Sequence, residues 1–318
     1  MKVLVLTNMY PSPQEPWCGS FVAEQVTALE AEGIDCDVLS FDGRRSRLEY
    51  FRAVRRLRRH LKEEKYDLMH AHYGLSGAVA LLARSRRPTV TTFWGSDTHV
   101  RWQRWISRAV AHRTTPIFVA RENAARLGLS EAAVIPSAVD LTFFQTRDQR
   151  AARQELGWPL DALIALFPGK RANSRKRPDL FDQAVALAHA HAPQLVGMAL
   201  EGMSRAQVVS AMNAADILLM TSDWEGSPLA VKEALACMTP VVSVPVGDVP
   251  ETIHGLPGCS IVSRDPKALA DALLTAVDCG RPTELRERAE RYSAPRLARE
   301  VIAVYERALS IGRDGPDS

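Results

Sequence analysis

Residues 216–243 constrain the fold of this chain more than any other stretch. The segment opens with an apolar run that is short enough for a buried strand, and it closes with Pro240-Val241-Val242 at the start of another. Between the two runs, Ser227 is predicted to cap a helix and Pro228 to be its first residue. Two strands joined through a helix usually pair in parallel. The stretch therefore predicts one unit of a parallel α/β sheet.

The same alternation of apolar runs and helical segments extends along most of the chain. Short apolar runs predict buried strands, and the segments between them have the periodicity of helices. The strands are expected near residues 3–6, 68–70, 89–93, 117–119, 133–135, 163–167 and 195–200. The predicted fold class is therefore α/β with parallel sheets.

The length of the chain predicts two domains. A chain of 318 residues fits two α/β domains better than one. Residues 147–157 separate two series of predicted strands, and they are expected to connect the domains. We therefore place the first domain at 1–157 and the second at 158–292.

The composition is that of a soluble globular enzyme. The hydrophobic fraction is 46%, the charged fraction is 24% and the net charge is +3, so the chain as a whole is not expected to bind nucleic acid. Five scattered cysteines without paired spacing indicate reduced thiols. No run approaches the roughly 20 apolar residues of a membrane-spanning helix, and no signal peptide is evident. We expect a cytoplasmic protein.

Residues 44–65 form a strongly basic segment with ten Lys or Arg and three Glu. Phe51, Val54, Leu57 and Leu61 recur at helical spacing, so the basic residues would cover the opposite face of a helix. One interpretation is a helix that lies on an anionic membrane surface. The other, which we favour, is a solvated helix whose apolar stripe packs on its own domain.

Two glutamates flank the predicted helix of the central stretch. Glu225 precedes the helix and Glu233 lies inside it. The free N–H groups of a helix N-terminus at the carboxyl end of a strand form a place where α/β sheets bind anions. Two solvent-facing acids on a capped helix are the structural alternative.

A second candidate is a basic loop at 167–178, which carries five Lys or Arg between a strand end and a helix start. Fixed cations in such a loop could neutralise a diphosphate, although runs of charge are usually solvated.

The string EGSPLAVKEALACMTPVV resembles the Glu-x7-Glu signature of the retaining GT-B glycosyltransferases of glycosyltransferase family 4. The opening MKVLVLTNMYPSPQEPWCGSFVAEQVTAL and the segment Val134-Ile135-Pro136-Ser137-Ala138-Val139-Asp140 are similar to segments of the same family. The motifs occur in the family's order over nearly the whole chain. The resemblance implies two Rossmann-like domains whose parallel sheets face a cleft. It also implies a C-terminal helix, 295–311, packed back on the N-terminal acceptor-side domain.

The resemblance assigns the C-terminal domain to a nucleotide-sugar donor. It implies that Glu225 faces the donor sugar, with the N–H groups of Gly226 and Ser227 beside it, and that Glu233 holds the ribose hydroxyls. The basic loop resembles the family's diphosphate-binding loop. The implied donor-binding set is Gly19, Lys170, Arg171, Lys176, Glu225, Gly226, Ser227 and Glu233, of which Glu225 and Lys176 are the implied catalytic residues. No metal or cofactor is implied.

The acceptor side departs from the family at one position. A His usually precedes the Gly-Ser-Asp that ends with Asp97, and Trp94 stands there instead. His70, His72 or His99 could take over its contacts, and the residues leave this choice open. The acceptor-side set is Trp94, Asp97 and His72.

The sequence therefore predicts a retaining, hexosyltransferase-type glycosyltransferase that needs no metal. Its acceptor would be a glycan, a lipid-linked molecule or a small molecule, in the synthesis of a bacterial surface polysaccharide or glycoconjugate. Two alternatives are a nucleotide-sugar 2-epimerase on the same fold and a non-catalytic regulatory scaffold, the latter suggested by Trp94. We expect location in the cytoplasm, with residues 44–65 as the region of any peripheral membrane contact.

Overall fold

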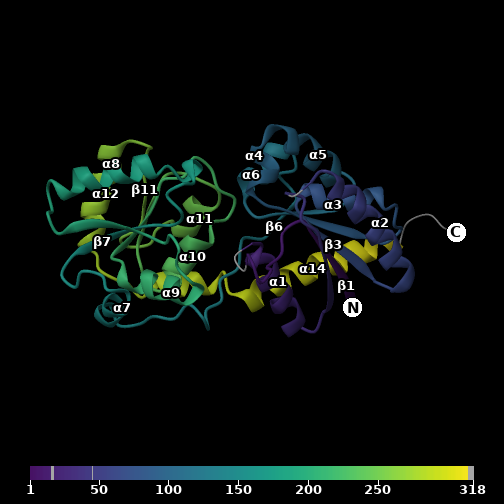
Figure 1. Ribbon diagram of the computed structural model, residues 1–318, viewed down its shortest axis with the longest axis horizontal. Coiled ribbons are helices and arrows are strands. Elements are labelled where there is room, and N and C mark those ends of the chain that lie inside the picture. The colour runs from purple at the N-terminus through teal and green to yellow at the C-terminus, as the bar shows by residue number, and fades with distance from the viewer. Residues whose placement is uncertain (16–17, 45, 314–318) are drawn as a thin grey trace. The chain divides into compact units, whose positions relative to one another are not determined.

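The computed structural model describes residues 1–15, 18–44 and 46–313, and the chain divides into two compact units (Figure 1). Unit 1 consists of Met1–Ala138 together with the chain from Ala294 onward, and unit 2 is Val139–Ser293. Each unit contains one parallel sheet, as the alternation of apolar runs and helices predicted.

The sheet of unit 1 has the strand order β2-β1-β3-β4-β5-β6, and all its described pairs are parallel. The strands are β1 (Lys2–Thr7), β2 (Asp35–Ser40), β3 (Leu68–His72), β4 (Thr89–Phe93), β5 (Thr115–Phe118) and β6 (Ala133–Val134). Strands β1, β3 and β4 lie inside the sheet and are almost wholly buried. Their continuous apolar runs are typical of strands covered on both faces.

The helices of unit 1 lie on both faces of this sheet (Figure 1). Helix α14 packs against α1, while α3 packs against both α2 and α5. The bounds are α1 (Ser20–Ala31), α2 (Leu48–Glu63), α3 (Gly74–Leu82), α4 (Gly95–His99), α5 (Arg101–Ala111), α6 (Arg121–Leu127) and α14 (Ala294–Arg313). The C-terminal helix therefore belongs to the same unit as the N-terminal strand.

The sheet of unit 2 has the order β11-β10-β9-β7-β8 and is also parallel. Its strands are β7 (Leu163–Phe167), β8 (Leu195–Ala199), β9 (Ile217–Met220), β10 (Val241–Ser243) and β11 (Ser260–Ile261). The remaining elements are α7 (Gln149–Leu156), the 3-10 turn η1 (Ser174–Lys176), α8 (Pro178–His189), α9 (Arg205–Ala214), α10 (Leu229–Ala236), α11 (Val249–Ile253), α12 (Pro266–Val277) and α13 (Glu284–Glu290).

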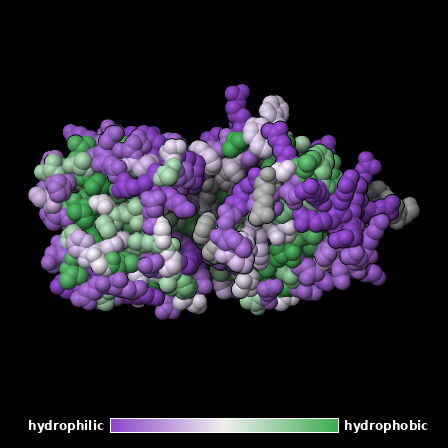
Figure 2. Space-filling view, in the orientation of Figure 1, coloured by the Kyte–Doolittle hydropathy of each residue, from purple (hydrophilic) through white to green (hydrophobic). Residues whose placement is uncertain are grey.

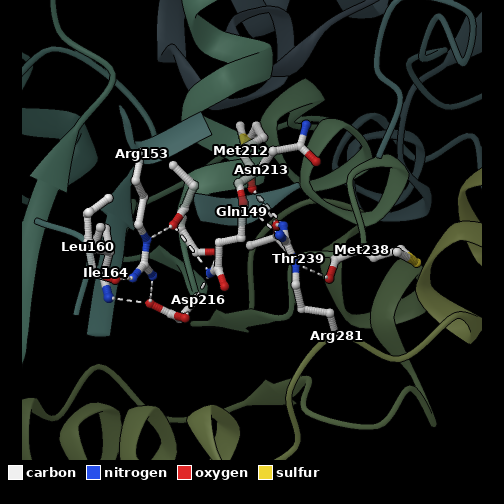
Figure 3. A network of polar contacts seen from close by, with 12 residues as sticks. Gln149, Arg153, Leu160, Ile164, Met212, Asn213, Asp216, Met238, Thr239 and Arg281 are labelled. Atoms are coloured by element: carbon white, nitrogen blue, oxygen red, sulfur yellow. Dashed lines mark hydrogen bonds and ion pairs between the residues drawn. The ribbon is translucent and has the colours of Figure 1, made fainter. Parts of the chain in front are cut away.

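The boundary between the units falls at Ala138–Val139 rather than at the predicted residue 157. The expected connection contains a helix, α7, that packs on α9 of unit 2. Figure 3 shows the polar network that holds it: Arg153 donates from Nη2 to Asp216 Oδ2 at 2.7 Å, and Gln149 Nε2 donates to Asp216 Oδ1 at 2.9 Å. The same carboxylate accepts the backbone N–H of Ile164 on β7. These bonds make α7 part of unit 2.

The basic segment forms a helix at Leu48–Glu63, shorter than the predicted 44–65. Leu57 is fully buried, and Val54 and Leu61 pack against the core of unit 1, as the packing interpretation expected. Phe51, in contrast, is 66% exposed. The apolar residues of α2 therefore do not all face the core.

Two further sequence expectations concern cysteines and membrane spans. The five cysteines are free. Across the described residues, every helix is too short or too polar to cross a bilayer.

Candidate functional site

Three loops meet at the carboxyl edge of the unit 2 sheet. They follow β7, β9 and β10, which are neighbours in the sheet order. The loop after β7 carries the basic residues, and the loop after β9 carries Glu225. Because parallel strands end at the same edge, residues far apart in the sequence come together there.

The Glu225 carboxylate pairs with two cations of the basic loop, Lys176 and Arg175. Its Oε1 lies 3.2 Å from Lys176 Nζ and 2.9 Å from Arg175 Nη1, and it also accepts the Ser222 hydroxyl at 2.9 Å. The carboxylate is almost completely buried. Burial alone would raise its pKa, but the charges of Lys176 and Arg175 outweigh this effect and hold the pKa below its ordinary value. Glu225 is therefore ionised.

The basic loop is fixed in shape by neighbouring backbone groups. The Thr221 hydroxyl donates to the carbonyl of Lys176 at 2.8 Å, and the N–H of Asp223 donates to the carbonyl of Arg175 at 2.9 Å. A Cβ at Gly169 would lie 2.9 Å from Cδ of Lys176. The Lys176 side chain therefore passes close over Gly169, where a larger residue would displace it from its present position.

The other cations of the loop have different surroundings. The Arg175 guanidinium stacks 4.6 Å above the Trp224 ring and donates to the Trp224 carbonyl. Arg171 pairs with Asp182 of α8 at 2.7 Å and lies on the solvent side. Lys170 is also exposed. The sequence expected Lys170, Arg171 and Lys176 to act together, and of these the structure brings Lys176 to Glu225.

Glu233 lies on α10, where its buried carboxylate pairs with the guanidinium of Arg205. Burial raises the pKa of Glu233, and Arg205 only partly opposes this shift. Arg205 is the first residue of α9, which begins with a capping box formed by Ser204 and Gln207. The structural alternative, two solvent-facing acids, is wrong because both glutamates are buried and paired.

Ser227 does not cap α10. The helix begins at Leu229 with Pro228 at the cap position, and the Ser227 hydroxyl instead donates to Asp248 Oδ2 at 2.7 Å. Asp248, after β10, also accepts from the fully buried Lys232 at 2.6 Å, and its N–H donates to the carbonyl of Gly226 at 3.1 Å. The serine is therefore drawn toward a buried ion pair rather than toward the helix N–H groups.

In unit 1, the acceptor-side candidates gather at the carboxyl ends of β3 and β4. The rings of His72 and Trp94 stack with centroids 6.0 Å apart. Asp97 Oδ2 accepts the N–H of Trp94 at 2.6 Å, and its Oδ1 accepts the N–H of Gly74 at 2.8 Å. Tyr73, between β3 and α3, has a φ of 73°, a strained value for a residue with a side chain.

Asp97, His70 and His72 are buried, and burial favours the neutral form of each. Burial raises the pKa of Asp97 to about 7, against the bonds from Gly74 and Trp94. Burial also lowers the pKa of His70 to about 3, and it lowers that of His72 well below the ordinary value, with His70 adding to the effect. His70 bonds to Tyr305 of α14 and to Thr92. It is therefore a structural histidine.

Gly19 lies at the start of α1 with a φ of 70°. A Cβ at this position would lie 2.4 Å from the carbonyl oxygen of Met9. The loop after β1 therefore requires glycine here on steric grounds.

The structure shows three site residues that sequence reasoning did not select: Arg175, Arg205 and Lys232. Arg175 lies in the predicted basic loop, and its neighbour Lys176 was chosen because it matched the family pattern. The capping box at 204–207 would have located Arg205 at a helix start. Nothing in the sequence pattern distinguishes Lys232 from a surface lysine. The described residues contain no cluster of three or more His, Cys, Asp or Glu able to hold a metal ion.

Two family models match the chain. Residues 2–135 match the glycosyl transferase 4-like domain, and residues 166–278 match glycosyl transferases group 1. Among curated relatives, TuaC of Bacillus subtilis, assigned to teichuronic acid biosynthesis, is 26% identical over 86% of this chain and 88% of its own length. The D-inositol 3-phosphate glycosyltransferase of Mycobacterium avium is 28% identical over 77% of this chain and 70% of its own.

Solved structures share the fold. Sucrose-phosphate synthase from Thermosynechococcus elongatus has a TM-score of 0.78 at 18% identity and covers 98% of this chain and 99% of its own. Anabaena HepE, solved with UDP and glucose, has a TM-score of 0.74 at 18% identity, covering 96% and 99%. The fold is therefore GT-B, as predicted, and the domain matches support a glycosyltransferase of the group 1 and group 4 superfamily.

Proposed function

We propose that this glycosyltransferase transfers a sugar from a nucleoside diphosphate donor to an acceptor hydroxyl with retention of configuration. The observation that carries the proposal is the buried carboxylate of Glu225 beside two cations, Lys176 and Arg175, at the carboxyl edge of a parallel sheet. Such an edge is the usual ligand site of an open α/β sheet. The relatives named for glycosyl transfer favour this activity over the epimerase and over the scaffold.

In this proposal the cations serve the leaving group. Lys176 and Arg175 neutralise the charge that develops on the diphosphate as its bond to the sugar breaks. Lys170 and Arg171 provide further positive charge at the mouth of the loop. These fixed charges take the role that a metal ion has in other phosphate sites, so the reaction needs no metal or cofactor.

Glu225 and Glu233 hold the two ends of the donor. Glu225, with the N–H groups of Gly226 and Ser227, binds the sugar hydroxyls, while Glu233 accepts bonds from the ribose. The carbon–oxygen bond to the diphosphate breaks as the acceptor oxygen bonds to the anomeric carbon on the same face. The acceptor proton moves to the leaving phosphate oxygen.

Unit 1 is proposed to serve the acceptor. Trp94, Asp97 and His72 are the acceptor-side residues, and Gly19 is assigned to the donor phosphates. The acceptor would be a glycan, a lipid-linked molecule or a small molecule used in bacterial surface polysaccharide or glycoconjugate synthesis. The protein would act in the cytoplasm, with peripheral membrane contact through the region 44–65.

A thermal-shift screen with nucleoside diphosphates and nucleotide sugars tests the proposal. A ligand at a hundred times its dissociation constant should add about 2.7 kcal/mol to the free energy of unfolding. We would begin with UDP and its sugars, since HepE was solved with UDP. The anomeric configuration of the transferred sugar, read by NMR, then tests retention. If no nucleotide stabilises the protein, the proposal is wrong.

A further inference from the structure

Helix α5 of unit 1 combines exposed tryptophans with unopposed positive charge. Trp102 is 58% exposed and Trp105 is 75% exposed. The helix also carries Arg101, Arg104 and Arg108, and its sequence RWQRWISRAVA contains no acidic residue. Exposing a tryptophan ring to water is unfavourable in free energy. Tryptophan together with arginine is typical of helices that lie at a membrane interface.

Helix α2 also exposes apolar side chains at its N-terminal end, although Glu49 pairs with two of its arginines, Arg52 at 2.6 Å and Arg56 at 3.6 Å. Leu48 is 59% exposed and Phe51 is 66% exposed, in the first turns of the helix. The helix sequence contains six basic and two acidic residues. Figure 2 shows hydrophilic side chains covering the part of unit 1 that contains α2 and projecting above α4 and α5. Helices α2 and α5 thus carry more basic than acidic side chains, although the net charge of the chain is only +3.

The two exposed groups flank one cavity. Helices α2 and α5 both pack on α3. A cavity of about 550 Å³ is lined by residues from the start of both helices, including Arg47, Tyr50, Trp102 and Gln103. Tyr73, at the carboxyl edge of the sheet, lines it too. Of the four exposed residues, Trp102 lines the cavity, Leu48 and Phe51 are the chain neighbours of the lining residues Arg47 and Tyr50, and Trp105 follows Trp102 by one helical turn. We call Leu48, Phe51, Trp102 and Trp105 the apolar rim.

We propose that the apolar rim and the arginines of α2 and α5 bind the surface of an anionic membrane, and that the cavity receives the phosphate-bearing head group of a lipid acceptor. The apolar rim would enter the boundary between head groups and acyl chains, while the arginines pair with lipid phosphates. Arg47 lines the cavity and supplies a cation to the phosphate group. The choice of acceptor class rests on the proposed function, whereas membrane binding does not.

Vesicle sedimentation tests the surface. The protein should bind phosphatidylglycerol vesicles more tightly than phosphatidylcholine vesicles at low salt, and it should detach at high salt. The double variant Trp102→Ala/Trp105→Ala should weaken binding about tenfold or more, because two large apolar groups no longer enter the lipid. Arg101→Gln and Arg104→Gln should each weaken it about fivefold. The matched control is Leu187→Ala/Arg150→Gln, exposed residues of unit 2, which should bind as the wild type does.

Three outcomes would contradict the proposed membrane-binding surface. The first is equal binding to neutral and anionic vesicles. The second is wild-type binding by the tryptophan double variant, with circular dichroism showing that the variant is folded. The third is a protein that binds acidic proteins or nucleic acid but not vesicles. Phe51→Ser provides a second apolar variant on the other helix.

A second set of vesicles tests the head-group cavity. Vesicles doped with a long-chain isoprenyl monophosphate should bind more tightly than phosphatidylglycerol vesicles of equal charge, and Arg47→Gln should remove about tenfold of this affinity. If free inorganic phosphate binds as tightly as the isoprenyl monophosphate in vesicles, the proposal that the cavity receives a lipid head group is wrong. Calorimetric titration with UDP separates the two proposals: the rim and Arg47 variants should bind UDP normally. If the wild-type protein does not bind UDP, only the proposal about the donor is contradicted.

Discussion

The two units place polar residues at the same edge of the same kind of sheet, but they neutralise these residues in different ways. In unit 2 the buried groups are charged and paired, as in Glu225 with Lys176 and Lys232 with Asp248. In unit 1 the buried groups are neutral: burial keeps a proton off His72 and on Asp97 over much of the range below pH 7. An edge with built-in ion pairs suits an anionic ligand that can exchange partners with them, whereas a neutral edge suits hydroxyl groups.

Breaking the most deeply buried pair should have the largest effect. Lys232→Met leaves Asp248 buried without its cation, which should lower the free energy of unfolding by about 3–5 kcal/mol. Urea denaturation measures the loss. The control is Arg150→Met, which breaks an exposed pair with Asp161 and should change stability by less than about 1 kcal/mol. Equal stability of the two variants would contradict the claim that unit 2 depends on buried charge.

The second-largest effect is expected from the loss of Lys176, the cation that contacts Glu225. Lys176→Ala should lower kcat by about 10²–10³-fold, because a preorganised charge on the leaving group is lost. Arg171→Ala removes a cation of the same loop that pairs with Asp182 on the solvent side, and it should cost much less. Steady-state kinetics on both variants makes the comparison. Similar losses would show that only the total charge of the loop matters.

Substitutions of the two glutamates should change nucleotide affinity by different amounts. Glu233→Ala removes the proposed hydrogen-bond acceptors for the ribose, worth about 1.5–3 kcal/mol, so UDP should bind at least tenfold more weakly. Glu225→Ala should leave UDP affinity unchanged or improve it, because it releases Lys176 and Arg175 from a competing carboxylate. Its loss should fall on turnover of the nucleotide sugar. Calorimetry with UDP decides, and an equal loss in both variants would refute the division of roles.

Acid should act on unit 1 through its histidines. The folded pKa values of His70 and His72 lie below their ordinary value, so the unfolded chain binds more protons as the pH falls from about 6.5 to 4. Each histidine then lowers the free energy of unfolding by up to about 1.4 kcal/mol per pH unit. Asp97, whose pKa is raised, acts in the opposite sense, but two histidines outweigh it. The thermal midpoint should therefore decrease on acidification, and His70→Gln should flatten the curve. An unchanged slope would contradict the assignment.

The smallest expected effect is that of a chelator. Lys176 and Arg175 are proposed to supply the counter-charge for the diphosphate, so excess chelator should leave the transfer rate unchanged. The assay compares initial rates with and without the chelator. Loss of activity that magnesium or manganese restores would show that the charged edge of unit 2 does not suffice.

The sequence predicted strands best where they are buried on both faces. Strands β1, β4 and β7 read as unbroken apolar runs, and each was located. Strand β2 was missed, because it lies at the sheet edge and its DCDVLS pattern is only partly buried. Helix α7 was taken for a connection, since its attachment to unit 2 depends on Asp216, more than 60 positions away in the sequence. Long-range contacts of this kind leave no local signal.

The same distinction applies to the candidate site. Lys176 and Glu225 were predicted from their match to the family's motifs, and the structure brings them together because their loops follow neighbouring strands. The partner of Glu233 was not predicted, because Arg205 comes from α9, whose start is set by a cap rather than by a family motif. The loss of the N-cap role by Ser227 has the same origin: its hydroxyl donates to the buried Asp248 and accepts from the buried Lys232 instead.

The chain enters and leaves unit 2 at one place. Val139 donates its N–H to the carbonyl of Tyr292 at 2.8 Å, and Val139 and Ser293 form an isolated parallel bridge. Residues 139–293 therefore form one continuous insertion in the chain of unit 1, and the two ends of the insertion lie side by side. Such an insertion is exchangeable as a block, because replacing it requires two adjacent joins and leaves both β1 and α14 in place. Recombination at this pair of positions would exchange unit 2, and with it the proposed donor site, while unit 1 kept its own sequence.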